Sequence, residues 1–230
     1  MTIAENLAAV RGRITDACAR AGRDPATVEV LPVSKTHPAS AVREARAAGC
    51  RRFGENKVLE ARDKATELDD PGVDWVIIGP LQTNKAKTLV EFAAEFQALD
   101  SLRVAEVLDR RLQSAGRTLD VLIQVNSSGE ESKSGLPPED VAGFCRQLNM
   151  FASLRPRGLM TLAANTPDRE IVRGCFDTVA EPRRRLRDEG VPGSWDVLSM
   201  GMSGDFELAI AAGSTCVRIG TAIFGARGTH

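Results

Sequence analysis

The sequence contains no tyrosine, only two histidines and five cysteines, and each scarcity argues against a class of function. One of the two histidines, His230, is the last residue, so a histidine-rich site is not expected and no metal is predicted. The cysteines are odd in number and form no CxxC pair, which predicts buried, reduced thiols in a cytoplasmic protein. They are Cys18, Cys50, Cys145, Cys175 and Cys216.

Long apolar runs and an excess of positive charge are missing as well. No apolar run approaches the roughly 20 residues of a membrane span, so no membrane association is predicted. Residues 1–5 lack the basic start and the following apolar stretch of a signal peptide. Lys and Arg number 30 against 31 Asp and Glu, and this balance argues against a nucleic-acid partner.

What the sequence does contain is a regular alternation of short β-rich runs and amphipathic helices. The first helix is marked by Ile3, Leu7, Val10 and Ile14, which recur on one face. Eight strands are then expected at residues 28–34, 51–54, 75–79, 96–99, 119–126, 156–160, 195–198 and 215–219. Helices are expected at residues 39–49, 56–68, 84–94, 102–116, 137–148, 169–189, 206–212 and 222–226.

Eight βα units in a chain of this length favour a closed (β/α)8 TIM barrel of the α/β class over an open Rossmann-type sheet. No linker, repeat or low-complexity segment divides the chain, so residues 1–230 are expected to form a single domain. Barrels of this kind carry their sites at the carboxyl-terminal ends of the strands. The polar segments at those positions are residues 34–37, 54–56, 79–85, 126–135, 199–205 and 220–221.

The loops after the seventh and eighth strands have the composition of a phosphate site. Gly201 and Gly204 allow the backbone to approach a ligand closely, while Ser199, Ser203 and Thr221 supply hydroxyl groups. Glycine and serine also make ordinary turns and helix caps, and for one loop alone that would be the better explanation. The presence of both loops favours a phosphate site.

Two cations lie in or directly after predicted strands, where they could face the site. Lys35 ends the first strand, where a lysine can form a Schiff base with an aldehyde if its surroundings lower its pKa. Taken alone, a solvated lysine is the commoner case, and the nearby His37 is interpreted as a loop residue. Arg218 lies within an apolar strand, where a charge is costly unless it faces a polar site, so we expect it to point toward the barrel mouth.

Two further charged segments have simpler interpretations. Residues 127–135 are interpreted as a flexible solvated loop, with a ligand lid as the second alternative. The run Arg183, Arg184 and Arg185 is expected to face water on a helix and to bind no nucleic acid.

Several of these segments, taken in order, resemble a known family. The matching segments are residues 33–36, 53–56, 78–85, 132–135, 158–160, 198–203 and 213–225. The match covers nearly the whole chain, and the last block together with the Gln82-Thr83-Asn84-Lys85 block makes it specific. The sequence resembles the YggS/PROSC family, the pyridoxal phosphate homeostasis proteins.

The resemblance implies a fold like the barrel domain of alanine racemase and pyridoxal 5′-phosphate (PLP) as the cofactor. It makes Lys35 the Schiff-base lysine, places Asn56 beside the cofactor ring, and turns Arg218 toward the pyridine nitrogen. The expected cofactor-binding residues are Lys35, Asn56, Ser199, Met202, Ser203, Arg218, Gly220 and Thr221, where Met202 contributes its backbone. Members of the family are associated with buffering or delivering PLP, without an established reaction, which implies PLP and apo forms of PLP enzymes as partners. The resemblance and the lack of a racemase-type second domain imply a monomer.

Two positions depart from the family pattern. The family often has tyrosine after the Gly-Glu-Asn motif, where this chain has Lys57. It often has histidine after the tryptophan that precedes the Gln-x-Asn-Lys block, where this chain has Val76. Neither change involves the expected lysine, phosphate or ring-nitrogen contacts.

The same residues favour a carrier over an enzyme, so no catalytic residue is predicted. A fixed cation at Arg218 disfavours protonation of the ring nitrogen and weakens the cofactor as an electron sink. Two-base racemisation also needs a second acid or base, which is a tyrosine in the related racemase, and this chain has none. The alternatives are a PLP-dependent enzyme (a weak amino-acid racemase or lyase) and a PLP-free Schiff-base aldolase.

Overall fold

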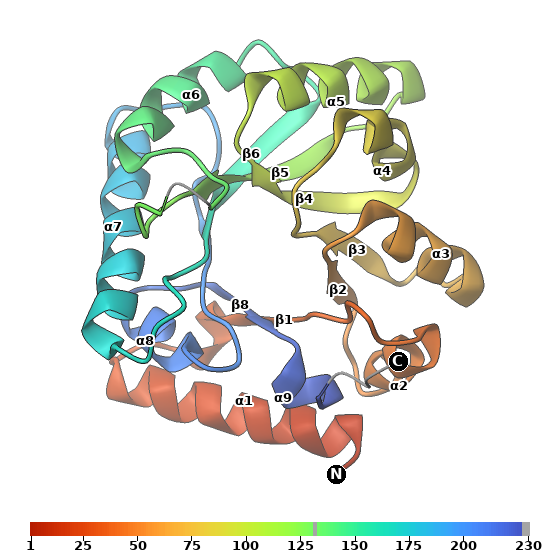
Figure 1. The fold of residues 1–230 in the computed structure, drawn as a ribbon, viewed down its shortest axis with the longest axis vertical. Coiled ribbons are helices and arrows are strands. Elements are labelled where there is room, and N and C mark those ends of the chain that lie inside the picture. The colour runs from red at the N-terminus through yellow and green to blue at the C-terminus, as the bar shows by residue number, and fades with distance from the viewer. Residues whose placement is uncertain (131–132, 227–230) are drawn as a thin grey trace.

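The computed structural model describes residues 1–130 and 133–226, which form one barrel of parallel strands surrounded by helices (Figure 1). Helices return the chain from one strand end to the start of the next strand, as parallel pairing requires. The predicted (β/α)8 TIM barrel is confirmed. The eight strands of the described residues are β1 (Glu29–Pro32), β2 (Arg52–Glu55), β3 (Asp74–Ile77), β4 (Ala93–Leu99), β5 (Leu119–Val125), β6 (Leu154–Thr161), β7 (Val197–Ser199) and β8 (Cys216–Ile219).

The helices form the outer layer, and α1 lies against α2, α8 and α9, so it packs across the first and last βα units of the barrel (Figure 1). The α-helices are α1 (Ile3–Arg20), α2 (Ala39–Ala47), α3 (Val58–Leu68), α4 (Ala86–Phe92), α5 (Leu102–Ala115), α6 (Val141–Leu148), α7 (Arg169–Asp188), α8 (Phe206–Ala211) and α9 (Thr221–Phe224). Short 3-10 helices occupy Pro25–Thr27, Thr83–Lys85 and Pro138–Asp140.

Local signals in the sequence account for how α1 starts and which face it buries. The Thr2 hydroxyl accepts a hydrogen bond from the Glu5 N–H at 3.2 Å, and the Glu5 carboxylate accepts one from the Thr2 N–H at 2.8 Å. This reciprocal pair satisfies two backbone donors that a helix start otherwise leaves without partners. The buried face of the helix consists of Leu7, Val10, Ile14, Ala17 and Cys18.

The barrel closes between its first and second strands along a short seam. The strand order is β1-β8-β7-β6-β5-β4-β3-β2, and β1 pairs with β8 so that Leu31 lies opposite Arg218. Within the described part of the chain, β1 and β2 are joined by one isolated bridge between Val33 and Gly54. The Ser34 N–H also donates to the Gly54 carbonyl at 3.0 Å. The seam therefore lies directly beside Lys35.

Two local expectations differ from the structure. Ala93 and Ala94 belong to β4 rather than to the preceding helix, because α4 ends at Phe92. Trp195 precedes β7 instead of starting it, and its φ of 53° is incompatible with an extended strand.

The arginine run on α7 is only partly solvated. Arg184 and Arg185 are exposed, as predicted, and form ion pairs with acidic residues of the same helix. Arg183 is half-buried instead, and it donates hydrogen bonds of 2.8 Å to the backbone carbonyls of Trp195 and Asp196. It therefore ties the irregular turn before β7 to the helix.

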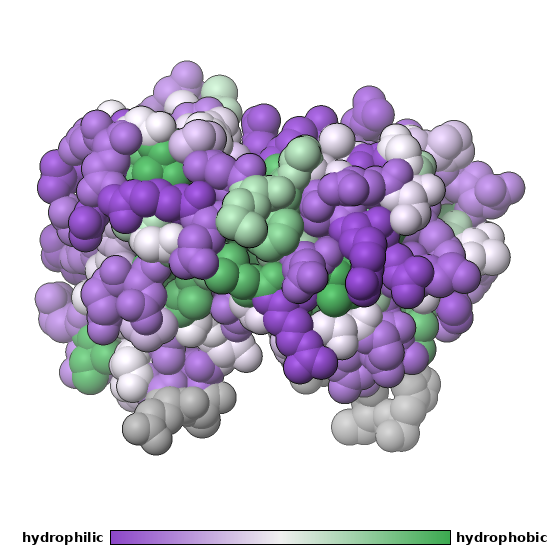
Figure 2. Space-filling model, turned by 90° about the horizontal axis from the view of Figure 1, so that it is seen from above, coloured by the Kyte–Doolittle hydropathy of each residue, from purple (hydrophilic) through white to green (hydrophobic). Residues whose placement is uncertain are grey.

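The surface is mostly polar (Figure 2), and the cysteines lie in the interior. Figure 2 views the molecule from the side of α5 and α6 and shows a mostly hydrophilic surface with an apolar area near its middle and smaller apolar areas around it. Among the described residues, no helix is long and apolar enough to cross a membrane. All five cysteines are buried and free. In the same described ranges, no group of three or more His, Cys, Asp or Glu side chains is placed to hold a metal ion.

Candidate functional site

A pocket of about 510 Å³ opens at the carboxyl-terminal ends of the strands. Its lining comes from the segments at the ends of every strand except β4, so the whole barrel contributes to one cavity. The charged residues of the described lining are Lys35, Lys133 and Arg218, with no carboxylate among them. A pocket with only positive side chains is suited to an anionic ligand. A second hollow of about 570 Å³ at the opposite end of the barrel involves none of the predicted site residues.

Lys35 follows β1 in a turn whose backbone is unusual. The lysine is half-buried and lines the pocket. The next residue, Thr36, has a φ of 68°, which lies in the left-handed region. Holding a non-glycine residue there costs about 1–3 kcal/mol and requires support from the surrounding structure. The direction in which Lys35 leaves the strand therefore depends on groups outside the pocket.

Those groups form a buried cluster of charges between β1, β2 and α3. The Lys64 ammonium donates to Glu55 Oε1 at 2.6 Å, to Glu60 Oε1 at 2.8 Å and to the Ser34 carbonyl at 2.8 Å. The Ser34 hydroxyl donates to Glu55 Oε1 at 2.6 Å, and the Thr36 N–H donates to Glu60 Oε1 at 2.6 Å. Every contact in this cluster is therefore made around the turn that carries Lys35.

The pKa values of the two glutamates in this cluster are shifted in opposite directions. Burial raises the pKa of Glu55, and hydrogen bonds from Lys64 and Ser34 only partly offset that effect. Glu55 Oε2 is buried without a hydrogen-bond partner within the described residues. Partial burial also raises the pKa of Glu60, but hydrogen bonds from Lys64 and the Thr36 N–H outweigh it, so the net shift is downward. The Glu60 carboxylate is thus the firmly ionised member of the pair.

Arg218 points into the barrel mouth from β8, as its place in the strand predicts. Only 3% of the residue is exposed, yet its guanidinium lines the pocket. It donates to the carbonyl and hydroxyl of Ser199 at 2.6 and 2.7 Å and to the Thr161 carbonyl at 2.7 Å. Burial lowers the pKa of Arg218 to about 10, so the group stays cationic at neutral pH.

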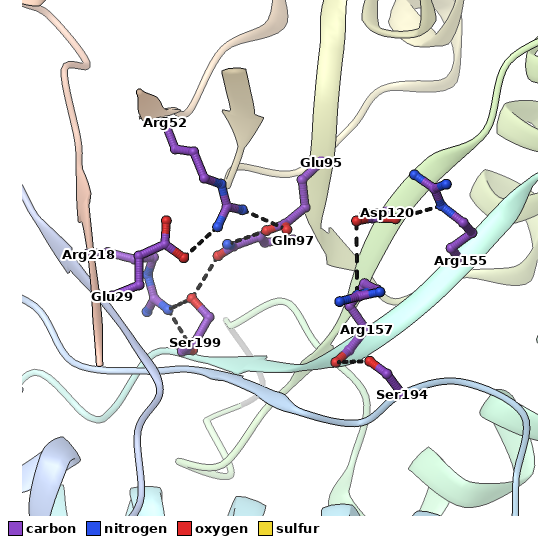
Figure 3. Close-up of polar contacts among 10 residues, drawn as sticks. All are labelled: Glu29, Arg52, Glu95, Gln97, Asp120, Arg155, Arg157, Ser194, Ser199 and Arg218. Atoms are coloured by element: carbon purple, nitrogen blue, oxygen red, sulfur yellow. Dashed lines mark hydrogen bonds and ion pairs between the residues drawn. The ribbon is translucent and has the colours of Figure 1, made fainter. Parts of the chain in front are cut away.

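A chain of polar contacts runs from Arg218 down through the barrel interior (Figure 3). The Ser199 hydroxyl donates to Gln97 Oε1 at 2.7 Å, and Gln97 Nε2 donates to Glu95 Oε1 at 2.6 Å. Glu95 is paired with Arg52 at 2.7 Å. Neutral groups thus separate the Arg218 cation from the nearest buried carboxylate of this chain of contacts.

The loops after β7 and β8 bring backbone donors to one wall of the pocket. Met202, Ser203, Gly220 and Thr221 all line it, and the Ala222 N–H donates to the Ser203 hydroxyl at 3.4 Å across the two loops. The Met202 N–H donates to the Asp205 carboxylate at 2.5 Å. Two adjacent N–H groups, those of Ser203 and Gly204, have no recorded acceptor in residues 1–130 and 133–226. This donor set suits a phosphate group.

Asn56 reaches the pocket from the end of β2 because Gly79, two residues after β3, leaves room for its backbone. A Cβ atom at Gly79 would lie 2.3 Å from the Asn56 carbonyl oxygen, so only glycine permits this close approach. Asn56 and Gly79 both line the cavity. The Gly-Glu-Asn and Gly-Pro segments of the sequence therefore meet at one corner of the site.

Comparison with known proteins identifies the family. The family model described as "Alanine racemase, N-terminal domain" matches residues 6–228. The pyridoxal phosphate homeostasis protein of Pseudomonas aeruginosa is 47% identical over 98% of this chain and 96% of its own length. That of Escherichia coli K12 is 45% identical over 98% of this chain and 97% of its own length. This chain belongs to the pyridoxal phosphate homeostasis protein family.

Solved structures agree with this membership of the pyridoxal phosphate homeostasis protein family. PipY of Synechococcus elongatus PCC7942, solved with PLP bound, is 37% identical to this chain and superposes with a TM-score of 0.86. The match covers 97% of this chain and 100% of PipY. The resemblance noted from the sequence is therefore confirmed over nearly the full chain.

The structure brings together all but one of the predicted site residues at this pocket. The residues that line the pocket are Lys35, Asn56, Met202, Ser203, Arg218, Gly220 and Thr221. Ser199 is fully buried beneath the pocket, where it bonds to Arg218 and Gln97 and does not line the cavity. Its predicted direct contact with the cofactor thus has no counterpart in its position.

The predicted solvated loop is instead folded against the barrel on both sides of residues 131 and 132, which lie outside the described residues. Lys133 lines the pocket, and its ammonium donates to Glu130 at 2.7 Å and to the Ala163 carbonyl at 3.2 Å. The Gly135 N–H donates to the Asp100 carboxylate at 3.0 Å. The signal that could have placed Lys133 here is its position two residues before Gly135, inside the Ser-Lys-Ser-Gly segment that carries the family resemblance.

The two departures from the family pattern lie away from the cavity. Lys57 is exposed before α3, and Val76 is fully buried in β3. Neither lines the pocket. His37, interpreted as a loop residue, packs its ring 5.2 Å from that of Phe224. None of these three residues alters the donors and cations described above.

Proposed function

We propose that this chain binds PLP at the carboxyl-terminal mouth of its barrel, as a Schiff base on Lys35, and serves intracellular PLP homeostasis without turnover of its own. The observation that carries the proposal is the meeting of Lys35, Arg218 and the β7 and β8 loops in one positively charged cavity. Relatives named pyridoxal phosphate homeostasis proteins, and PipY solved with PLP bound, support it.

The residues present fit the cofactor group by group. Ser203, Gly220 and Thr221 would hold the phosphate, since their loops supply hydroxyl and N–H donors at one wall. The backbone expected to help at Met202 would do so through the next N–H groups, those of Ser203 and Gly204, because the Met202 N–H itself donates to Asp205. Asn56 would lie beside the ring, and Arg218 would face the ring nitrogen. The bound cofactor supplies an aldehyde and an electron-withdrawing ring, while the protein supplies the amine, the phosphate cradle and a fixed cation.

The cavity supports a carrier more than an enzyme. A cationic Arg218 opposes protonation of the ring nitrogen, which is the state that stabilises a carbanion. Among its described lining residues there is no Asp, Glu or His, and the whole chain contains no tyrosine. A second acid or base for racemisation would therefore have to be another lysine, whose ordinary pKa is far from neutral.

The remaining parts of the proposal concern the cellular setting. We propose a monomer that works in the cytoplasm and passes PLP to apo forms of PLP enzymes. Five buried, free cysteines support a reducing compartment. Holding the cofactor through a reversible bond to Lys35 would let a recipient with a stronger site take it.

The experiment is an absorption spectrum of the purified protein before and after addition of PLP, followed by borohydride reduction and peptide mapping. We expect a yellow protein with the reduced label on Lys35. Lys35→Ala should lose the label and change the unfolding free energy by less than about 1 kcal/mol, because the side chain ends outside the core. Lys57→Ala, an exposed lysine, is the matched control and should label normally.

Three results would change the proposal. A protein that stays colourless with PLP would move the PLP-free aldolase to the front. A label on another lysine would contradict the assignment of Lys35. Reproducible turnover of an amino acid by the wild type, lost in Lys35→Ala, would replace the carrier with a PLP-dependent enzyme.

A further inference from the structure

The peptide groups on both sides of Lys35 are held by one cluster of charged side chains. The carbonyl of Ser34, which precedes the lysine, accepts a hydrogen bond from the Lys64 ammonium at 2.8 Å. The N–H of Thr36, which follows it, donates to Glu60 Oε1 at 2.6 Å. Lys64 and Glu60 are themselves joined at 2.8 Å through that same oxygen. Hydrogen bonds therefore fix the backbone immediately before and immediately after Lys35.

These hydrogen bonds stabilise an unusual backbone conformation at Thr36. Thr36 is a β-branched residue with a φ of 68°, a conformation that such residues rarely adopt without support. Its N–H is bonded to a carboxylate from α3 rather than to a neighbouring strand. Loss of that acceptor would allow the turn to relax toward the commoner backbone regions, and the Cα–Cβ bond of Lys35 would change direction with it.

The cluster is anchored on one side and stands apart from the ligand. The Lys64 and Glu55 side chains are 8% and 0% exposed, so this ion pair is fixed in the protein interior. None of Glu55, Glu60 and Lys64 is among the described residues that line the pocket. The hydrogen bonds that connect these side chains to the site are those to the backbone at Ser34 and Thr36.

We propose that Glu60, held by Lys64, is a positioning residue that aims the Lys35 amine into the pocket by fixing the turn at Thr36. The inference rests on the proposed attachment of PLP to Lys35. Glu60 acts on the approach of the amine to an aldehyde, not on the phosphate cradle, which is built from β7 and β8 at another wall of the cavity. Covalent attachment and non-covalent binding should therefore respond differently when Glu60 is changed.

The test compares Glu60→Ala and Glu60→Gln with the wild type in two measurements. The first is the rate at which PLP becomes trapped on Lys35, followed by borohydride quenching and peptide mapping. The second is the affinity for pyridoxine 5′-phosphate, which carries an alcohol in place of the aldehyde and cannot be attached. Glu67→Ala is the matched control, because Glu67 is an exposed carboxylate on the same helix.

We expect Glu60→Ala to slow attachment about tenfold, because misplacing a reacting group by a fraction of an ångström has effects of this size. Glu60→Gln should lie between it and the wild type, since the amide oxygen still accepts from Thr36 but the charge that holds Lys64 is gone. Affinity for pyridoxine 5′-phosphate should change less than about twofold in both variants, as the phosphate contacts are untouched. Glu67→Ala should match the wild type in both measurements.

Two results would overturn the inference while the proposed function stands. One is a wild-type attachment rate in Glu60→Ala. The other is an equal loss of attachment and of pyridoxine 5′-phosphate affinity, which would mean general damage to the pocket. A wild-type protein that carries no label on Lys35 would overturn the proposed function, and the inference with it.

Discussion

Lys64 and Arg218 are both buried cations near one pocket, and the protein compensates their charges in different ways. Lys64 bonds to two carboxylates, those of Glu55 and Glu60. Arg218 bonds to two carbonyls and a hydroxyl, and no described carboxylate lies within ion-pair distance of it. The charge of Lys64 is thus used inside the protein, whereas the charge of Arg218 is available to whatever enters the cavity.

This difference suits Lys64 to a structural role and Arg218 to contact with a ligand. A buried ion pair contributes little net stability, but removing one partner is costly because the other charge is left without compensation. A buried guanidinium without a counter-charge raises the energy of the empty site and gains from an electron-rich neighbour. The Lys64 cluster therefore holds the backbone beside the pocket in place, and Arg218 is suited to interact with a ligand in the pocket.

The largest expected effect is on stability, and it should distinguish the two cations directly. Lys64→Met leaves Glu55 buried without its cation and should lower the unfolding free energy of the ligand-free protein by about 3–5 kcal/mol. Arg218→Met removes a charge that lacks a carboxylate partner and should cost about 1–2 kcal/mol. Urea unfolding of both variants in the absence of PLP measures the difference.

The same pair of variants should show the reverse order in ligand binding. Arg218→Met should weaken PLP more than Lys64→Met does, when affinity is compared under conditions where both variants are folded. Equal stability losses in the two variants, or a larger loss in Arg218→Met, would contradict the contrast between the two cations.

A smaller effect on stability is expected at Gln97, which lies between Ser199 and Glu95 in the chain of contacts below Arg218. Gln97→Leu leaves the Ser199 hydroxyl without its acceptor and takes one donor from Glu95, so the unfolding free energy should fall by about 1–3 kcal/mol. The looser Arg218 should also shift the absorption maximum of bound PLP. Gln147→Leu, on the exposed face of α6, is the control and should change neither quantity. An unchanged spectrum in Gln97→Leu would show that Arg218 does not need this support.

The smallest effect is a pH dependence that belongs to the Lys64 cluster. Partial burial raises the pKa of Glu60, but Lys64 and the Thr36 N–H bring it below its ordinary 4.5. A carboxyl group with a lowered pKa stabilises the fold above its unfolded pKa, and this contribution is lost as the pH falls through the folded value. Glu60→Gln should therefore be less stable than the wild type by about 0.5–1 kcal/mol at pH 7.

That difference should shrink as the pH drops below 4.5. Urea unfolding of the wild type and Glu60→Gln across this range measures it, with Glu67→Gln as a control that should show no such trend. A difference that stays constant down to the lowest pH at which the fold survives would mean that the Glu60 charge is not what matters.

The barrel and the two cations facing the pocket follow from local patterns. Alternation between apolar strands and amphipathic helices depends only on neighbouring residues, so the order of elements could be predicted with errors confined to their ends. Lys35 and Arg218 could be placed because a strand end and a charge inside an apolar strand are visible in one segment. The loops after β7 and β8, which line the pocket, were predictable for the same reason.

The support beneath the pocket could not be found in this way. Lys64 stands next to two other charged residues, Arg62 and Asp63, and that pattern is typical of a solvated helix face. Its burial depends on Glu55 from the preceding strand and on the backbone at Ser34, which are distant in sequence. Ser199 shows the same limit, because its neighbours suggest a ligand contact while Gln97, from β4, draws its hydroxyl inward.

The pairing of β1 with β8 has a consequence for the timing of synthesis. Lys35 belongs to the first βα unit, whereas Arg218, Gly220 and Thr221 belong to the last. A ribosome that has made nine-tenths of the chain has supplied Lys35 but not the residues opposite it. The finished cavity therefore exists only once synthesis has passed Thr221, and a copy that stops earlier lacks this wall of the pocket.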